Sequence, residues 1–409
     1  MRPFLLALTL IGLATTAASA ADWPQFLGPA SNSVSPETGL LKSFPAGGPK
    51  VLWTVAVGPG YGGPAVEGGK VYLLDRVNDQ KDALRCLNLA DGKEEWRFEY
   101  DAPGTVGNNG SRSTPTVTDK FIFTVGLFGH LTCIDKTTHK PVWQKNILSD
   151  FGGGKLPKWA VSQSPIFYKG LLIVAPLNGT VGLVALDPAT GAVKWQSKPV
   201  GGMQYASPEI VKVGGADAIA IMAGGGAAMV NPASGNVLCQ LPYKCSIPIP
   251  NVTQVDDTRF FVTGGYKAGS ALFQVAAGGV KELWRDAQIG AHIQQPIVYK
   301  GCIYAVCNTN DRTDGLVCWD LAGKVLWQTG KSPSLDKGNL ILTGDGTIYS
   351  MDGASGDLRI IQPDPAGYKE LAKTPLLGGK EIWGAMAIAN GKLLARDQKQ
   401  LKCVDIKAP

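Results

Sequence analysis

The chain has 409 residues and a formal net charge of +6, and its Lys and Arg residues are scattered through turns instead of forming a basic block. This distribution argues against nucleic acid as a partner. Hydrophobic residues make up 44%, enough for a large core, while 52 Gly and 27 Pro favour many short strands and tight turns over long helices.

Residues 1–20 have the pattern of a secretory signal peptide. Arg2 supplies the positive charge, residues 4–13 form a short apolar run, and Ala18-Ser19-Ala20 is a small-residue cleavage motif. We expect cleavage after Ala20 and a mature chain that is periplasmic or secreted. Because no Cys lies near this motif we expect no lipid anchor, and no later apolar run is long enough to span a membrane.

Residues 21–49 are rich in Pro, Gly and Ser and show no period. We interpret them as an extended N-terminal arm that lies across the following domain and is anchored by Trp23 and Phe26. Residues 50–57, KVLWTVAV, then read as one isolated strand.

A short phrase recurs along the rest of the chain. In LDPATGAVKW, residues 186–195, Asp187 opens a turn, Gly191 follows four residues later and Trp195 eight residues later. The copies are NLADGKEEW at 88–96, DKTTHKPVW at 135–143, NPASGNVLC at 231–239 and DLAGKVLW at 320–327. A fixed phrase at a fixed period indicates a repeat architecture.

Six of the repeats begin with a Pro and an alternating apolar strand, and these landmarks recur at about 45 residues, the length of a propeller blade. The landmarks are Pro64, Pro115, Pro165, Pro208, Pro250 and Pro296. Eight units can be counted, and the last, residues 382–406, has only three strands. The strand at 50–57 can supply the fourth. We therefore predict an all-β, eight-bladed β-propeller of four-stranded antiparallel blades over residues 50–409.

The Trp residues of the phrase are predicted to dock neighbouring blades by burying a large aromatic surface. They are Trp53, Trp96, Trp143, Trp195, Trp284 and Trp327. Gly191 and its equivalents should take positive φ in the turn, with Asp187 accepting hydrogen bonds from the turn amides. His139 stands where the Gly is expected.

The eight Cys residues do not form an obvious disulfide framework. Four of them occupy equivalent repeat positions and should behave as small buried hydrophobes: Cys86, Cys133, Cys318 and Cys403. Cys302 and Cys307 should face opposite ways on one strand. Cys239 and Cys245, six residues apart, could form a disulfide or remain free thiols.

The LD-x-x-TG-x-x-x-W phrase, the SP-x-V strands, the arm motif WPQFLGP and the segment RSTPT at 112–116 resemble the PQQ-repeat propellers. The resemblance covers nearly all of the mature chain. That superfamily includes quinoprotein alcohol dehydrogenases and the outer-membrane assembly lipoprotein of the BamB type. The first would imply pyrroloquinoline quinone (PQQ) with a Ca²⁺ held by Glu, Asn and Asp; the second would imply protein partners in the cell envelope.

Propeller geometry places the residues before each inner strand around the mouth of the central channel. These predicted ligand-binding residues are Tyr61, Arg112, Trp159, Gln163, Tyr205, His292, Gln294 and Trp383. Aromatic, amide and cationic groups suit a planar or anionic ligand or a peptide, but they could equally serve to fill the channel. The loops expected on this face are residues 76–83, 101–110, 147–157 and 308–314.

No catalytic constellation stands out, and none of the three His residues, His130, His139 and His292, has metal-ligand spacing. Glu209 and Glu381 are the main carboxylates of the mouth segments. We expect a monomeric, exported scaffold, more readily non-catalytic than enzymatic, that binds a protein or another polymer and needs no metal or cofactor. The alternatives are a quinone-dependent dehydrogenase with a degenerate site that uses PQQ and Ca²⁺, and an assembly factor of the BamB type.

Overall fold

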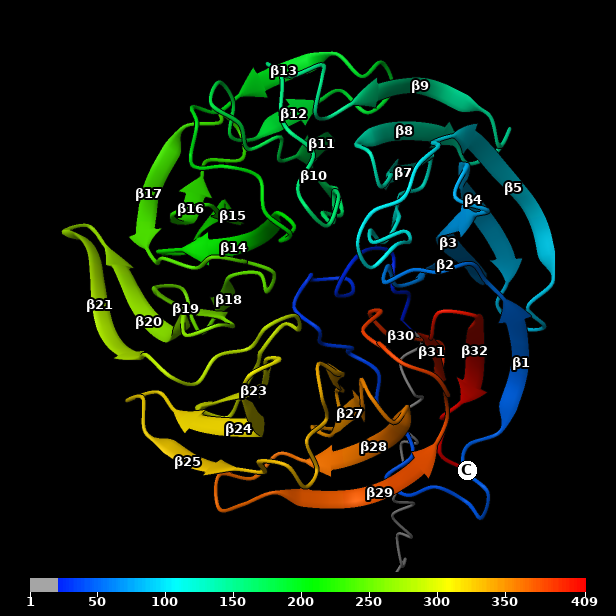
Figure 1. The fold of residues 1–409 in the computed structure, drawn as a ribbon, viewed down its shortest axis with the longest axis vertical. Coiled ribbons are helices and arrows are strands. Elements are labelled where there is room, and N and C mark those ends of the chain that lie inside the picture. The colour runs from blue at the N-terminus through cyan, green and yellow to red at the C-terminus, as the bar shows by residue number, and fades with distance from the viewer. Residues whose placement is uncertain (1–20) are drawn as a thin grey trace, which may run out of the picture.

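The computed structural model describes residues 21–409, so the expected signal peptide and its cleavage site lie outside the described residues. The described chain forms eight four-stranded antiparallel sheets arranged as blades around one axis. Figure 1 shows the first strand of each blade near the axis and the fourth on the rim. The predicted eight-bladed β-propeller is confirmed. None of the described residues form a helix long and apolar enough to cross a membrane.

The first four blades follow one another in the chain and have the same strand order. Blade 1 consists of β2 Ala65–Glu67, β3 Lys70–Val77, β4 Lys81–Asn88 and β5 Glu94–Asp101; blade 2 of β6 Thr116–Val117, β7 Phe121–Val125, β8 His130–Asp135 and β9 Pro141–Asn146; blade 3 of β10 Ile166–Tyr168, β11 Leu171–Val174, β12 Val184–Leu186 and β13 Val193–Gln196; blade 4 of β14 Glu209–Val213, β15 Ala216–Ala223, β16 Gly226–Val230 and β17 Val237–Pro242.

The remaining blades complete the ring. Blade 5 consists of β18 Thr253–Gln254, β19 Arg259–Gly264, β20 Gly269–Ala276 and β21 Gly279–Asp286; blade 6 of β22 Ile297–Tyr299, β23 Cys302–Asn308, β24 Thr313–Asp320 and β25 Val325–Gln328; blade 7 of β26 Asn339–Leu342, β27 Ile348–Met351, β28 Asp357–Gln362 and β29 Lys369–Pro375; blade 8 of β30 Ala387–Ala389, β31 Lys392–Arg396 and β32 Gln400–Asp405.

The two ends of the propeller meet in blade 8. The first strand, β1 Val51–Ala56, pairs antiparallel with β32, with Trp53 opposite Cys403. This is the closure that the orphan strand at 50–57 predicted. Because the outermost strand of the last blade comes from the start of the chain, the ring cannot open without breaking this ladder.

Five of the six Trp residues that were predicted to dock neighbouring blades donate their indole N–H to the next blade. Trp143 Nε1 donates to the carbonyl oxygen of Pro188 at 2.9 Å, and Trp195 Nε1 donates to that of Pro232 at 3.1 Å. The other three bonds of this kind are Trp53 to Leu89 at 2.9 Å, Trp284 to Leu321 at 3.1 Å and Trp327 to Asp364 at 2.8 Å. Each accepting carbonyl belongs to the outer-hairpin turn of the following blade.

The turn Gly residues give these Trp rings room. Gly191 has φ 69° as predicted, and a Cβ there would lie 2.9 Å from the ring of Trp143. Asp187 accepts hydrogen bonds from Ala189 N at 3.0 Å and Thr190 N at 3.1 Å, also as predicted. In blade 2 His139 takes the same left-handed conformation, φ 61°, and its ring stacks on Trp96 at 4.3 Å. The imidazole therefore replaces the Gly as the docking surface.

The core lies between the blades. One buried cluster, for example, joins Ile173 and Ala185 of blade 3 to Ile219 and Val230 of blade 4. All eight Cys are free, so Cys239 and Cys245 form no disulfide. Cys302 and Cys307 belong to two different clusters, in line with the prediction that they face opposite ways on β23.

The prediction of long loops at residues 76–83 and 308–314 is wrong. The strands β3 and β4 extend to leave only residues 78–80 as a turn, and β23 and β24 leave only residues 309–312. The physical reason in blade 1 is a buried ion pair: Arg76 Nη1 lies 3.0 Å from Asp82 Oδ1, and both side chains are fully buried. Arg76 and Asp82 lie opposite each other in the β3–β4 ladder, which continues to Val77 and Lys81 at the turn.

The arm of residues 21–49 crosses the face of tight turns, opposite the long loops. Trp23 is buried and pairs with Val66 of β2, and Leu40 bridges Lys407. Glu37 is also buried, and its carboxylate accepts hydrogen bonds from the amides of Asn390 and Gly391 in the turn between β30 and β31. Figure 1 shows the arm in blue across the middle of the ring.

The Trp–turn contact gives a stability prediction with a matched control. In Gly92→Ala the new Cβ would lie 2.7 Å from the ring of Trp53, at φ 72°. In Gly69→Ala the φ is similar, 74°, but no atom lies within 4 Å. We expect Gly92→Ala to lower the free energy of unfolding by about 2–4 kcal/mol and Gly69→Ala by about 1 kcal/mol, measured by urea denaturation. If both variants lost the same free energy of unfolding, the loss would come from backbone strain and not from the contact with Trp53.

Candidate functional site

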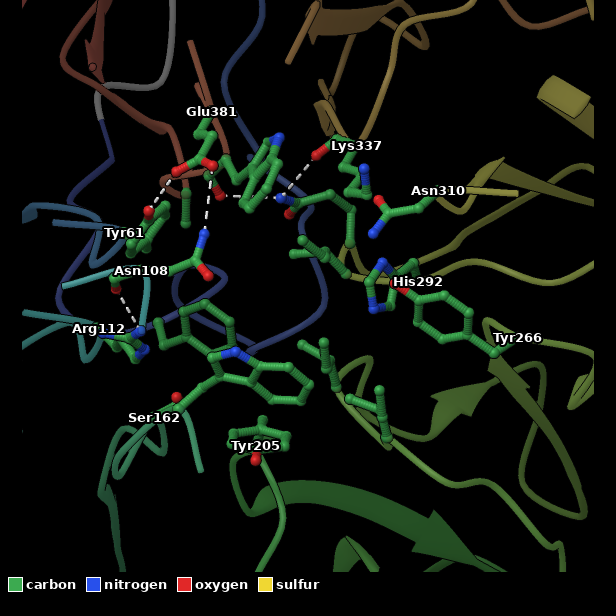
Figure 2. Close-up of a pocket in the computed structure, with 18 residues that line it drawn as sticks. Tyr61, Asn108, Arg112, Ser162, Tyr205, Tyr266, His292, Asn310, Lys337 and Glu381 are labelled. Atoms are coloured by element: carbon green, nitrogen blue, oxygen red, sulfur yellow. Dashed lines mark hydrogen bonds between the residues drawn. The ribbon is translucent and has the colours of Figure 1, made fainter. Parts of the chain in front are cut away.

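A cavity of about 450 Å³ lies at the axis of the ring. Its walls come from the segments that precede the inner strands, and loops of blades 5 and 6 contribute Tyr266 and Asn310. Phe26 of the arm also lines it, so the arm that crosses the opposite face reaches into the channel. Figure 2 shows side chains from different blades converging on this space. The volume lies within the range of small-molecule sites.

Seven of the eight residues predicted at the channel mouth line this cavity: Tyr61, Arg112, Trp159, Tyr205, His292, Gln294 and Trp383. The structure thus brings together residues that are far apart in the sequence. Ligand binding by them stays a prediction.

Gln163 is placed differently from the expectation. Its side chain is buried, its Nε2 donates to the carbonyl oxygen of Ala175 at 2.7 Å, and its Oε1 accepts from the amide of Ala175 at 2.8 Å. Both ends of the amide are therefore used to tie the start of blade 3 to the end of β11. This pairing turns the side chain away from the cavity lining.

Polar side chains next to the landmark Pro residues have a structural role that the sequence did not reveal. Ser164 Oγ accepts a hydrogen bond from Thr114 N at 2.9 Å, Ser207 Oγ accepts one from Ser164 N at 2.8 Å, and Asn251 Oδ1 accepts one from Ser207 N at 2.9 Å. Each bond links one blade to the next beside the axis. This chain of contacts sets the spacing of the cavity wall.

Glu381 is the carboxylate of the cavity. It accepts a hydrogen bond from Tyr61 Oη at 2.5 Å and one from Asn108 Nδ2 at 3.2 Å (Figure 2). Burial and the Glu381 carboxylate raise the pKa of Tyr61 to about 12, so the phenol stays protonated as a donor. Glu209, the other carboxylate of the mouth segments, is buried at the start of β14 and is not part of the cavity lining; burial raises its pKa well above the usual value.

Arg112 organises the loop between blades 1 and 2. Its guanidinium donates to the carbonyl oxygens of Gly110 at 2.6 Å and Gly107 at 3.0 Å, and it lies 5.2 Å from the ring centroid of Tyr61. Burial lowers the pKa of Arg112 to about 10, which leaves it charged at neutral pH. The Tyr61 ring stacks in turn on Trp383 at 5.7 Å.

Lys337 is a cavity residue that sequence reasoning missed. Its Nζ lies 5.0 Å from the ring centroid of Trp383 and 3.5 Å from Asp336 Oδ1, while Asp336 Oδ2 accepts a hydrogen bond from Trp383 Nε1 at 2.9 Å. Lys337 precedes the inner strand of blade 7, as the predicted residues do in other blades. Blade 7 lacks the landmark Pro at that point, so the sequence did not mark Lys337 as a residue of the channel mouth.

His292 lies on the blade 6 side of the cavity, edge-on to Tyr266 at 4.7 Å (Figure 2). Its side chain is buried, with the residue 9% exposed, and Nδ1 has no hydrogen-bond partner among the described residues. Burial and the nearby Lys337 charge lower the pKa of His292 to about 4, against the opposing effect of Asp336 and Asp311. The imidazole is therefore neutral at physiological pH.

The carboxylates of the cavity do not form the Ca²⁺ site that the resemblance implied. The described residues include no group of three or more His, Cys, Asp or Glu side chains placed to hold a metal ion. Glu381 already has two donors, and Asp336 is engaged with Trp383 and Lys337. We therefore assign no chemical step to such a group.

The depressed pKa of His292 predicts a pH-dependent loss of stability. As the pH falls, His292 in the unfolded chain, with a pKa of about 6.5, is protonated at a higher pH than in the folded chain. Stability from this group is intact above about pH 6.5 and is lost as the pH falls toward about 4. Between about pH 7 and about pH 4, the free energy of unfolding of the wild type should fall by up to about 3 kcal/mol more than that of His292→Asn. Urea denaturation at each pH measures this difference. Parallel curves would show that His292 does not titrate in this range.

Comparison with known proteins places the chain in a family. A family model described as outer membrane protein assembly factor BamB matches residues 104–329, more than half of the chain. An outer membrane protein assembly factor BamB from Burkholderia pseudomallei (strain K96243) is 23% identical over 367 residues, covering 85% of both chains. A protein of the same name from Xanthomonas campestris pv. campestris is 29% identical over 92 residues, 22% of each chain.

Solved structures share the fold at low identity. BamB from Moraxella catarrhalis has a TM-score of 0.60 at 15% identity, covering 88% of this chain and 98% of its own. A europium-containing methanol dehydrogenase has a TM-score of 0.66 at 13% identity, covering 94% and 89%. These likenesses describe the architecture, whereas the match to the family model covers all strands of blades 2 to 6. The chain therefore belongs to the family of outer membrane protein assembly factor BamB, within the superfamily of PQQ-like β-propellers.

Proposed function

We propose that this protein is a non-catalytic scaffold of the bacterial cell envelope that binds a protein partner and takes part in outer-membrane protein assembly. The observation that carries the proposal is the family membership, supported by a relative named as an assembly factor that matches 85% of the chain. An exported location fits this role and agrees with the signal peptide expected at residues 1–20.

The two faces of the ring differ in how much of them is available to a partner. The arm occupies part of the tight-turn face, where Asp22 accepts a hydrogen bond from the amide of Gly68 and Glu37 contacts the turn at Asn390. The opposite face carries the long connections of residues 102–115 and 147–165. Loops on a rigid scaffold are where binding residues usually lie.

One loop on that face presents an apolar side chain among cations. Leu156 is 41% exposed, and Lys155 and Lys158 beside it are also exposed. The other large exposed hydrophobic residues lie on outer-rim strands: Val51, Val142, Val193, Leu238 and Leu283. An apolar tip flanked by Lys suits a partner segment that combines apolar and acidic side chains.

Site-specific photo-crosslinking in the native host tests this proposal. A photoreactive amino acid at position 156 should crosslink to a component of the outer-membrane assembly machinery, identified by mass spectrometry. The matched control is position 193, where Val193 is 46% exposed on the rim strand β13. Crosslinks to that machinery from position 193 alone, or from neither position, would contradict binding through the long-loop face.

The quinone alternative has its own test. Purified protein is titrated with PQQ and CaCl₂ while the quinone absorbance and the reduction of an artificial electron acceptor with alcohols and sugars are followed. Under the scaffold proposal we expect no saturable spectral change and no turnover. Stoichiometric binding with acceptor reduction would replace the scaffold proposal with an oxidoreductase.

A further inference from the structure

The axial cavity contains more binding chemistry than a scaffold needs to fill its channel. Aromatic rings from different blades line it, including Tyr61, Trp159, Tyr205 and Trp383. Tyr61 and Trp383 form a stacked pair at 5.7 Å, and Trp159 and Tyr205 form a tilted pair at 5.6 Å. Within the cavity lining, Arg112 lies over the Tyr61 ring and Lys337 over the Trp383 ring, so Trp159 and Tyr205 are the better aromatic platforms for a ligand.

Polar groups surround these platforms. Figure 2 shows Asn108 and Glu381 on one side and Asn310 and His292 on another. His292 adds an imidazole ring to this lining, and its Nδ1 is itself buried without a hydrogen-bond partner within the described chain.

The charges of the cavity are already engaged. Much of the donor capacity of Arg112 goes to carbonyl oxygens of its own loop, and Lys337 lies beside Asp336. Glu381 is matched with Tyr61 and Asn108. A multiply charged anion would need uncommitted cations, so the site favours a neutral ligand that forms hydrogen bonds.

We propose that the axial cavity binds a neutral saccharide of one or two sugar rings. A pyranose has apolar C–H faces that stack on aromatic rings, and hydroxyl groups around its edge that both donate and accept hydrogen bonds. This matches aromatic platforms ringed by amide, imidazole and hydroxyl groups. A peptide strand presents its polar groups along two lines and matches such a ring of partners less well. Phe26 in the lining and the volume of about 450 Å³ set the limit on size.

Saccharide binding is separate from partner binding through the long loops. Leu156, the proposed partner contact, is not among the residues that line the cavity. An Asn310→Ala substitution, which changes a cavity residue from a loop of blade 6, should therefore weaken saccharide binding and leave crosslinking from position 156 unchanged. Either proposal can fail without the other.

Isothermal titration calorimetry of the purified protein tests the proposal. The probes are maltose, cellobiose and diacetylchitobiose, with citrate, inorganic phosphate and an acidic-apolar peptide as competitors of other classes. We expect at least one disaccharide to bind with one-to-one stoichiometry and a Kd below about 1 mM. Trp159→Ala should weaken that affinity at least about tenfold, and Trp159→Phe should restore most of it.

A second pair of variants removes the dependence on one substitution. Asn310→Ala, in the cavity, should weaken binding several-fold, whereas Asn236→Ala, exposed on the outer turn of blade 4, should not. The proposal is overturned if no saccharide binds at concentrations up to about 10 mM, or if only an anion or the peptide binds in a way that depends on Trp159.

Discussion

The contact between each outer Trp and the hairpin turn of the next blade is the interaction on which the ring depends. A blade alone leaves both sheet faces uncovered, and its core forms only when a neighbour packs against it. The Trp indole combines a large apolar face with one N–H, which donates a hydrogen bond to a carbonyl oxygen of the next turn. Trp195, for example, donates to the carbonyl oxygen of Pro232. Where the turn Gly is absent, His139 provides the opposing surface by stacking on Trp96.

Closure turns these pairwise contacts into one rigid frame. Because β1 completes blade 8, each blade has two neighbours, and the segments before the inner strands are held at a constant distance from the axis. The links through Ser164, Ser207 and Asn251 add hydrogen bonds between blades at that radius. A cavity of defined shape follows from this frame, without any helix or long lid among the described residues.

The arm makes the two faces unequal. Its buried Trp23 and Glu37 fix it across the tight turns, while Phe26 reaches the axial cavity. The long connections of the other face remain open to solvent, with Leu156 at the tip of one of them. The arm thus occupies part of one face and leaves the long connections on the other.

The sequence by itself determined the ring. The repeated phrase, the spaced Pro residues and the orphan strand at 50–57 are local or periodic signals, and each blade repeats the same physics, so blade number and closure could be read from them. It also placed seven of the residues that line the cavity, because their position before an inner strand is part of the repeat. Only the tertiary structure decided which side chains turn inward. Gln163 satisfies its amide on Ala175, Lys337 has no Pro beside it to mark its place, and the pairing of Glu381 with Tyr61 spans 320 residues of chain. Such pairings depend on distances across the ring, which no local pattern encodes.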